Sequence, residues 1–238
     1  MRQVGFLIWA MIAGILAVLL WLAPSYGQTT FGGKFALGGK PSVPIATAAP
    51  ACEALTNVNA VSVGVNIAGT NRMALAIVQY SGSPSVSSVG NGTQNATLVG
   101  TADATGQVQA SFWRLLAPTL GTQTWTAQLS GIVGAASLCV INFENASGVQ
   151  NFVSDAAGSS SVNLSTSSAV GNVVISAYVS ANNFFNSASD TGLTYSTPGG
   201  IIVTRIGQTA GAPTVNFTAS LSGSNVWTVG LIDIVRAN

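Results

Sequence analysis

The stretch from Asn71 to Leu98, NRMALAIVQYSGSPSVSSVGNGTQNATL, constrains the fold of this chain more than any other. The unbroken apolar run Met73–Val78 predicts a strand that is buried on both faces. The SGSP segment then interrupts the chain, a second short strand contains Val86 and Val89, and the NGT triplet predicts another tight turn. Strands and turns that alternate at this short spacing are typical of an antiparallel sheet.

The same alternation continues along the chain, and no window after residue 27 has a helical period. Clusters of Gly, Ser, Asn, Asp and Pro separate the expected strands and supply turn chemistry. This pattern predicts an all-β protein, an antiparallel β-sandwich of jelly-roll type. The remaining expected strands are Val61–Ile67, Arg72–Tyr80, Ala96–Val99, Val108–Leu115, Thr122–Leu129, Ala135–Phe143, Val162–Leu164, Val173–Val179, Leu193–Tyr195, Ile201–Ile206, Val215–Leu221 and Val226–Val235.

The N-terminal segment, residues 1–27, carries an export signal. Arg2 precedes the charge-free apolar run Val4–Ala23, and Ser25-Tyr26-Gly27 offers small residues for a signal peptidase. The run is also long enough to span a bilayer as a helix. We expect either cleavage after Gly27 or retention as a hydrophobic N-terminal helix that anchors the chain. In both cases Arg2 favours a cytoplasmic N-terminus, and the rest of the chain is exported to the cell surface or secreted.

Residues 28–50 are expected to form a flexible arm, because Gly, Pro, Ala and Ser leave little to bury. The arm contains GGK twice, with Lys34 and Lys40 as the chain's lysines. It is either a solvated tether or a segment that docks on a neighbouring copy. The β-sandwich domain is expected to occupy residues 51–238.

Charge is sparse, and this limits the partners. Only 5% of the 238 residues are charged and the net charge is +1, against roughly 25% charged residues in ordinary soluble proteins. A basic footprint for nucleic acid is therefore absent from the sequence. Low charge also leaves little repulsion between copies, and edge strands lack the lysines that discourage strand pairing. We therefore expect homo-oligomers or filaments.

The titratable side chains offer little catalytic chemistry. The chain has no His, which removes the commonest general base and most zinc sites. The six carboxylates are scattered, so we expect no enzyme, cofactor or metal site. Asp233 lies inside the apolar segment GLIDIV, where it either pairs with a buried Arg or faces solvent. The carboxylates are Glu53, Asp103, Glu144, Asp155, Asp190 and Asp233.

Aromatic side chains are the remaining candidates for binding. Trp113, Trp125 and Trp227 lie on expected strands beside apolar neighbours, which favours the core. Phe184 and Phe185 lie in the polar segment SANNFFNSASD. They form either an exposed contact loop or a loop folded back over the core edge.

The two cysteines, Cys52 and Cys139, are expected in an oxidising compartment after export. Cys139 shares one face of an apolar strand with Ile141 and Phe143, so it points inward. A disulfide would tie the first strand to the sandwich. The alternative is a buried thiol at Cys139 and an unrelated thiol at Cys52.

Three short motifs resemble those of a group of uncharacterised secreted bacterial β-sandwich domains. They are the N-R-apolar opening at Asn71-Arg72, the V-x-S-V-x-x-G hairpin within Ser85–Thr93, and a W-x-L-x-x-P-x-x-G segment that begins at Trp113 and ends at Gly121. The resemblance covers roughly residues 71–178. It implies a sandwich scaffold and no catalytic residues.

These observations favour a non-catalytic exported structural or adhesive surface protein that self-assembles, as part of a cell envelope, an extracellular filament or a virion. The alternative is a carbohydrate-binding module, with a glycan as partner. An exposed row of aromatic residues on one sheet face would favour the module. We expect no nucleic-acid partner, and contact with a membrane only through an uncleaved N-terminal helix.

Overall fold

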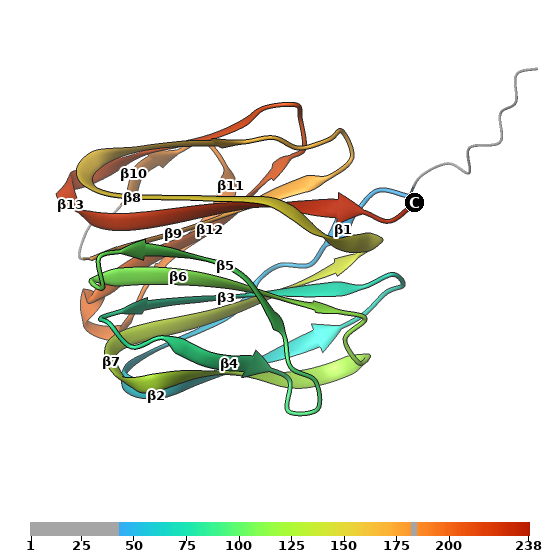
Figure 1. The fold of residues 1–238 in the computed structure, drawn as a ribbon, viewed down its shortest axis with the longest axis horizontal. Coiled ribbons are helices and arrows are strands. Elements are labelled where there is room, and N and C mark those ends of the chain that lie inside the picture. The colour runs from blue at the N-terminus through green and yellow to red at the C-terminus, as the bar shows by residue number, and fades with distance from the viewer. Residues whose placement is uncertain (1–42, 182–184) are drawn as a thin grey trace, which may run out of the picture. The chain divides into compact units, whose positions relative to one another are not determined.

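The computed structural model describes residues 43–181 and 185–238, all within one compact unit (Figure 1). The predicted signal or anchor helix at 1–27 and most of the predicted arm lie outside the described residues. Among the described residues, no helix has the length and apolar character needed to cross a membrane.

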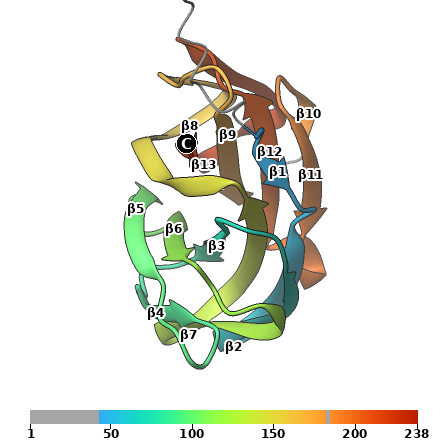
Figure 2. The same ribbon diagram turned by 90° about the vertical axis from the view of Figure 1, so that its right-hand side faces the viewer.

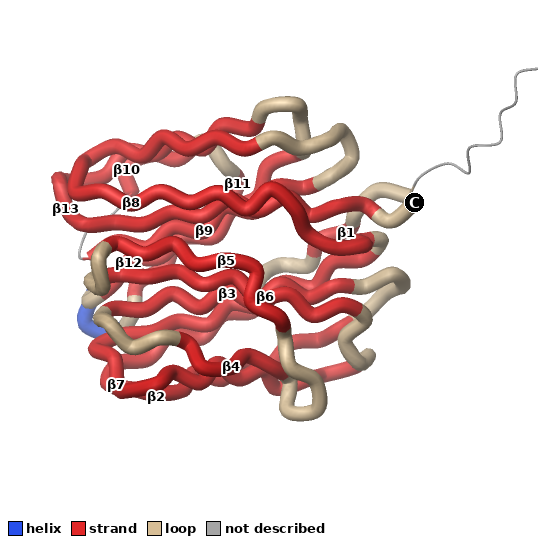
Figure 3. Tube along the Cα trace, viewed as in Figure 1, coloured by secondary structure: helices blue, strands red, loops and turns tan. Residues whose placement is uncertain are grey.

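Strands make up most of the described chain, and their pairings are antiparallel, as the sequence predicted (Figure 3). The all-β sandwich expectation is therefore confirmed at this level. The elements are β1 (Ala46–Thr47), β2 (Ala51–Ile67), β3 (Met73–Ser81), β4 (Val86–Gly90), β5 (Thr97–Ala104), β6 (Val108–Leu116), β7 (Gly121–Glu144), β8 (Ala146–Thr166), β9 (Val173–Ala181), β10 (Phe185–Ala188), β11 (Thr191–Ser196), the short 3-10 helix η1 (Pro198–Gly200), β12 (Ile202–Ala210) and β13 (Val215–Arg236).

The two sheets come from two consecutive halves of the chain and repeat one topology. In the first half β7 lies between β2 and β3, followed by β6 and β5, and β4 also pairs with β7. In the second half β13 lies between β8 and β9, followed by β12 and β11, and β10 also pairs with β13. Figures 1 and 2 show the halves stacked on each other.

The strand register shows the same repeat. Met73, the first residue of β3, pairs with Leu116 on one side and with Phe143 on the other. Val173, the first residue of β9, pairs with Ala210 and Ile234 in the same way. The longest strands shift register part-way, so that residues 121–129 of β7 pair with residues 60–67 of β2 and with β4. Each half thereby folds one part of its sheet over the other.

This arrangement creates a core inside each half and a central core between the halves. Alternate residues of β3 serve different cores: Met73, Leu75 and Ile77 belong to the central core, while Ala74 and Val78 belong to the core of the first half. β3 is therefore buried on both faces, as its apolar run predicted. Full burial of one such large side chain contributes about 1.5–3 kcal/mol.

One polar bond crosses the central core. Gln79 lies on the same face of β3 as Ile77, and its side-chain Nε2 donates to the backbone oxygen of Tyr178 in β9 over 2.6 Å. Because this amide is fully buried, the bond fixes how the two halves face each other.

Part of the segment predicted as a flexible arm belongs to the sheet. Ala46 and Thr47 pair with Glu144 and Phe143 of β7, and the Ala48 amide donates to the Asn142 carbonyl at 3.0 Å. Residues 46–48 have no apolar pattern that would predict a strand, and their backbone hydrogen bonds to β7 order them. The paired part of the chain therefore includes residues 46–48, ahead of residue 51.

Candidate functional site

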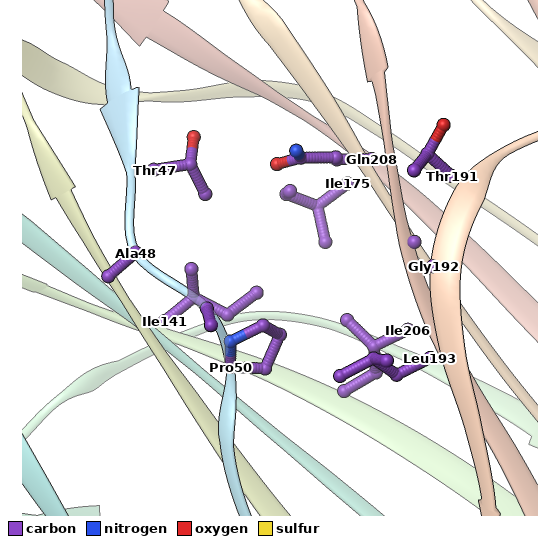
Figure 4. A pocket seen from close by; sticks show the side chains of 12 residues that line it. Thr47, Ala48, Pro50, Ile141, Ile175, Thr191, Gly192, Leu193, Ile206 and Gln208 are labelled. Atoms are coloured by element: carbon purple, nitrogen blue, oxygen red, sulfur yellow. The ribbon is translucent and has the colours of Figure 1, made fainter.

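An open cavity lies between the halves, on the side where the segment before β2 faces β11 and β12 (Figure 4). Its volume is about 410 Å³. The central core supplies apolar side chains from three strands, Ile141 of β7, Ile175 of β9 and Ile206 of β12. The remaining lining residues are Thr47, Ala48, Ala49, Pro50, Thr191, Gly192, Leu193, Gly207 and Gln208.

The polar groups of this cavity lie at its mouth. Gln208, Thr47 and Thr191 also line an adjoining hollow of about 510 Å³, so the two hollows share these residues. In Figure 4 the Gln208 amide and the Thr47 side chain lie at one end, while Pro50, Ile141 and Leu193 lie at the other. No charged residue is among the described residues that line the cavity. It can therefore hold an uncharged group by apolar contact and orient it with hydrogen bonds.

An ion pair holds the β11 wall of the cavity in place. The Arg205 guanidinium of β12 lies 2.6 Å from the Asp190 carboxylate, immediately before β11, and also donates to the Asp190 backbone oxygen over 3.0 Å. Ser176 of β9 donates to the same carboxylate. Gly207 leaves room for it, since a Cβ there would lie 1.9 Å from Asp190 Oδ2. The partly buried pair fixes where β11 begins.

Among the described residues, no group of three or more His, Cys, Asp or Glu side chains is arranged to hold a metal ion. Asp155 lies on β8, and Asp103 accepts a turn hydrogen bond from the Gly106 amide at 2.9 Å.

The two outcomes predicted for Asp233 are both wrong. Its carboxylate is fully buried and accepts hydrogen bonds from Gln150 at 2.8 Å, Ser168 at 2.6 Å and Asn172 at 3.0 Å. Neutral donors replace the expected Arg, because the β8–β9 loop folds over this carboxylate. The Asp233 carboxylate therefore holds the β8–β9 loop in place.

Phe185, for which the sequence left open an exposed contact loop or a loop folded back over the core edge, lies at the core edge. This residue begins β10, is half-buried and packs against the core of the second half. Its ring lies 4.4 Å from the Tyr178 ring and 5.7 Å from the Arg205 guanidinium carbon. Pairing of β10 with β13 draws the ring inward. Phe184 lies outside the described residues.

The other large aromatic side chains lie in the cores. Trp113, Trp125 and Trp227 are buried, which confirms their predicted place. Burial raises the pKa of the Tyr80 phenol to about 12, and the Asp103 carboxylate adds to the rise. Burial also raises the pKa of Tyr178. None of these five side chains is available to stack on a sugar.

Cys52 and Cys139 form a disulfide between adjacent strands. They lie directly opposite each other on β2 and β7, with their Cα atoms 4.1 Å apart. Cys139 is fully buried in the central core, and Cys52 is half-buried beside it. The bond ties β2 to the strand that supplies Ile141 to the cavity.

The cavity itself was not predicted. Its residues come from the supposed arm and from the short segment TGLT at Thr191, neither of which shows a binding motif. The sequence signal for the cavity was a run of small and polar residues near apolar strands. Such runs are common in ordinary loops, so this one did not indicate a cavity.

Comparisons with known proteins leave the chain without an assigned family. No family model and no curated protein matches it. One solved structure, described as "A Structural Element that Modulates Proton-Coupled Electron Transfer in Oxalate Decarboxylase", aligns with 84% of this chain and 78% of its own, at 10% identity and a TM-score of 0.21. A score this low carries no argument about fold or activity.

Proposed function

We propose that this protein is a non-catalytic, exported structural or adhesive surface component that self-assembles into homo-oligomers or filaments. The observation that carries the proposal is the edge strand β11. Among the described strands it pairs with β12 alone. Its sequence, TGLTYS, contains no charged residue, and Leu193 within it is 56% exposed. Such an edge offers unpaired backbone groups to a second chain, with no charge to discourage pairing.

The few charges support the same proposal. Arg205 and Asp190 neutralise each other, and Asp233 is buried within hydrogen bonds. The charge left on the surface is therefore smaller than the 5% in the sequence suggests. Repulsion between copies is correspondingly weak.

Export is supported by the disulfide. Bonds of this kind persist in oxidising compartments and are rare in the cytosol. Together with the apolar N-terminal run, the Cys52–Cys139 bond favours a secreted or cell-surface location.

The alternative function, a carbohydrate-binding module, has less support. Such a module needs exposed aromatic rings on one face, whereas Trp113, Trp125, Trp227, Tyr80 and Tyr178 are buried. Binding of soluble glycans to the exported protein would favour this alternative.

We further infer that each half is a jelly-roll unit. A jelly roll has eight strands in two sheets. In the first half β2 and β7 each contribute to both layers, and β3, β4, β5 and β6 complete that number. This topology also fits the scaffold implied by the resemblance to secreted bacterial sandwich domains.

Light scattering on the exported protein tests the main proposal. We expect size-exclusion chromatography to give a mass that is a multiple of the single-chain mass and rises with concentration. A single-chain mass at every concentration would contradict self-assembly.

A further inference from the structure

The two halves close the central core differently. One side of this core lies between β8 and the β5–β6 pair, and the other lies between the segment before β2 and the β11–β12 pair. Because the halves repeat one topology, these two sides are equivalent places. Because the backbone topology is the same on both sides, a difference between them comes from their side chains.

On the first side an aromatic ring fills the gap. Phe152 of β8 lies against Phe112 of β6, with ring centroids 5.2 Å apart and an interplanar angle of 60°. Glycines make room for the ring: a Cβ at Gly100 would lie 2.3 Å from Phe152, and one at Gly230 would lie 3.2 Å from it. The slot is therefore shaped for a phenyl ring.

On the second side the equivalent place is the open cavity. Pro50 stands two residues before Cys52, which faces Cys139, while Phe152 stands two residues before Ser154, which faces Gly230. Cys139 and Gly230 occupy the same register position in β7 and β13. Pro50 therefore takes the place of Phe152.

The opposite wall corresponds in the same way. Ile206 occupies the position in β12 that Phe112 occupies in β6. Leu193 pairs with Ile206 as Gly100 pairs with Phe112. With no ring at residue 50, about 410 Å³ remains open between these residues.

We propose that this cavity binds a small, uncharged aromatic compound, with its ring against Pro50, Ile141 and Ile206. The ring lies beside the exact position that Phe152 takes in the other half, because Leu193 and Cys139 stand where Gly100 and Gly230 make room for Phe152. Burial of a ring between Pro50, Ile141 and Ile206 supplies the favourable transfer energy. The volume lies within the range of natural small-molecule pockets. A charged ligand is disfavoured, because no counter-charge lines the cavity to offset desolvation.

The mouth adds a preference for one polar substituent. The Gln208 amide provides both donor and acceptor groups, and Thr47 and Thr191 provide hydroxyls. A ring with a hydroxyl group can therefore bury its apolar part and keep its polar end at the mouth. The inference does not rest on self-assembly, although β11 both lines the cavity and forms the proposed assembly edge.

The test is a fluorine NMR titration of the full chain with 4-fluorobenzyl alcohol. We expect saturable broadening and shift of the fluorine signal, and at least tenfold weaker binding in Pro50→Phe, which places a ring in the cavity. Val170→Phe is the matched control, because Val170 is 80% exposed and lies outside the cavity. The control should bind as the wild type does. No saturable binding to the wild type, or equal binding to Pro50→Phe and the wild type, would overturn the proposal.

A second variant keeps the test independent of changes in folding. Gln208 is exposed, so Gln208→Leu should leave the fold intact. We expect it to weaken binding of 4-fluorobenzyl alcohol about fivefold through one lost hydrogen bond, and to leave fluorobenzene binding unchanged. Unchanged binding of the alcohol would contradict the assigned orientation and, with it, the site.

Discussion

Asn142 in β7 and Asp233 in β13 occupy equivalent positions in the two halves, and each holds the equivalent loop of its own half by hydrogen bonds. Asn142 pairs with Ala74 in β3, and Asp233 pairs with Val174 at the matching place in β9. The Asn142 amide donates to the Ala68 carbonyl in the β2–β3 loop at 3.1 Å. The Asp233 carboxylate accepts from two side chains of the β8–β9 loop. The repeat therefore extends from strand order to side-chain chemistry.

Replacing these two residues should have unequal effects. Asp233→Leu removes a buried carboxylate that accepts three hydrogen bonds; it strands the buried Asn172 donor, while Ser168 is half-buried and Gln150 is exposed. A hydrogen bond to a charged group contributes about 1.5–3 kcal/mol, and an unsatisfied buried group costs about 1–3 kcal/mol. We expect it to lower the free energy of unfolding by about 3 kcal/mol or more. Asn142→Leu strands the Ala68 carbonyl and should cost about 1–2 kcal/mol. Urea denaturation measures both, and a larger loss in Asn142→Leu would contradict the assignment.

Phe152→Ala should empty the ring-filled slot of the central core. Phe152 is half-buried, so its removal should cost less than the about 3–5 kcal/mol of a fully buried ring, and the glycines beside it cannot fill the gap. We expect the variant to bind a second 4-fluorobenzyl alcohol in the vacated slot, with recovery of part of the lost stability. Thermal unfolding with and without the alcohol checks this. Equal stabilisation of variant and wild type would argue that the two places are not equivalent.

Reduction of the disulfide should loosen β2. The bond joins residues separated by 87 positions, and its loss costs about 2–4 kcal/mol in unfolding free energy. Cys52→Ser combined with Cys139→Ala should show this loss without reductant. Its stability should then be insensitive to dithiothreitol, whereas that of the wild type should fall. If dithiothreitol does not change the unfolding free energy of the wild type, the disulfide is refuted.

Alkaline pH should destabilise the fold through Tyr80. The folded-state pKa of about 12 lies above the ordinary tyrosine value of 10.0, so Tyr80 loses its proton at lower pH in the unfolded chain than in the folded one. The stability from the neutral phenol is fully present below pH 10 and is lost as pH rises toward 12. Tyr80→Phe should flatten this pH dependence, at the cost of the Tyr80–Gln109 hydrogen bond. Urea denaturation between pH 8 and 11 provides the measurement, and an unchanged slope in Tyr80→Phe would contradict it.

The sequence predicted those strands whose side chains are apolar in a regular pattern. Met73–Val78 is apolar without interruption, and it lies between two cores. Residues 146–161 were missed, because Ser, Gly, Ala and Asp give no pattern there. They form most of β8 through backbone pairing with β13, which only the tertiary fold provides. Strand β10 was missed for the same reason, since the polar neighbours of Phe185 hide its pairing with β13.

The repeat and the cavity could not be predicted from residue identity. Leu75 and Ile175 occupy equivalent positions and are both large apolar residues. Pro50 and Phe152 also occupy equivalent positions, but their side chains differ in size and shape. The open cavity follows from that second difference, which depends on the strand register of the folded chain and not on residue type.

The central claim, self-assembly through β11, is tested most directly by sedimentation velocity of the exported protein and of its Leu193→Lys variant. A lysine on this edge should discourage pairing without disturbing the core, because Leu193 is 56% exposed. Val170→Lys adds the same charge at another exposed position and is the control. We predict assemblies for the wild type and for Val170→Lys, and a monomer for Leu193→Lys. A monomeric wild type, or assemblies that persist unchanged in Leu193→Lys, would contradict the claim.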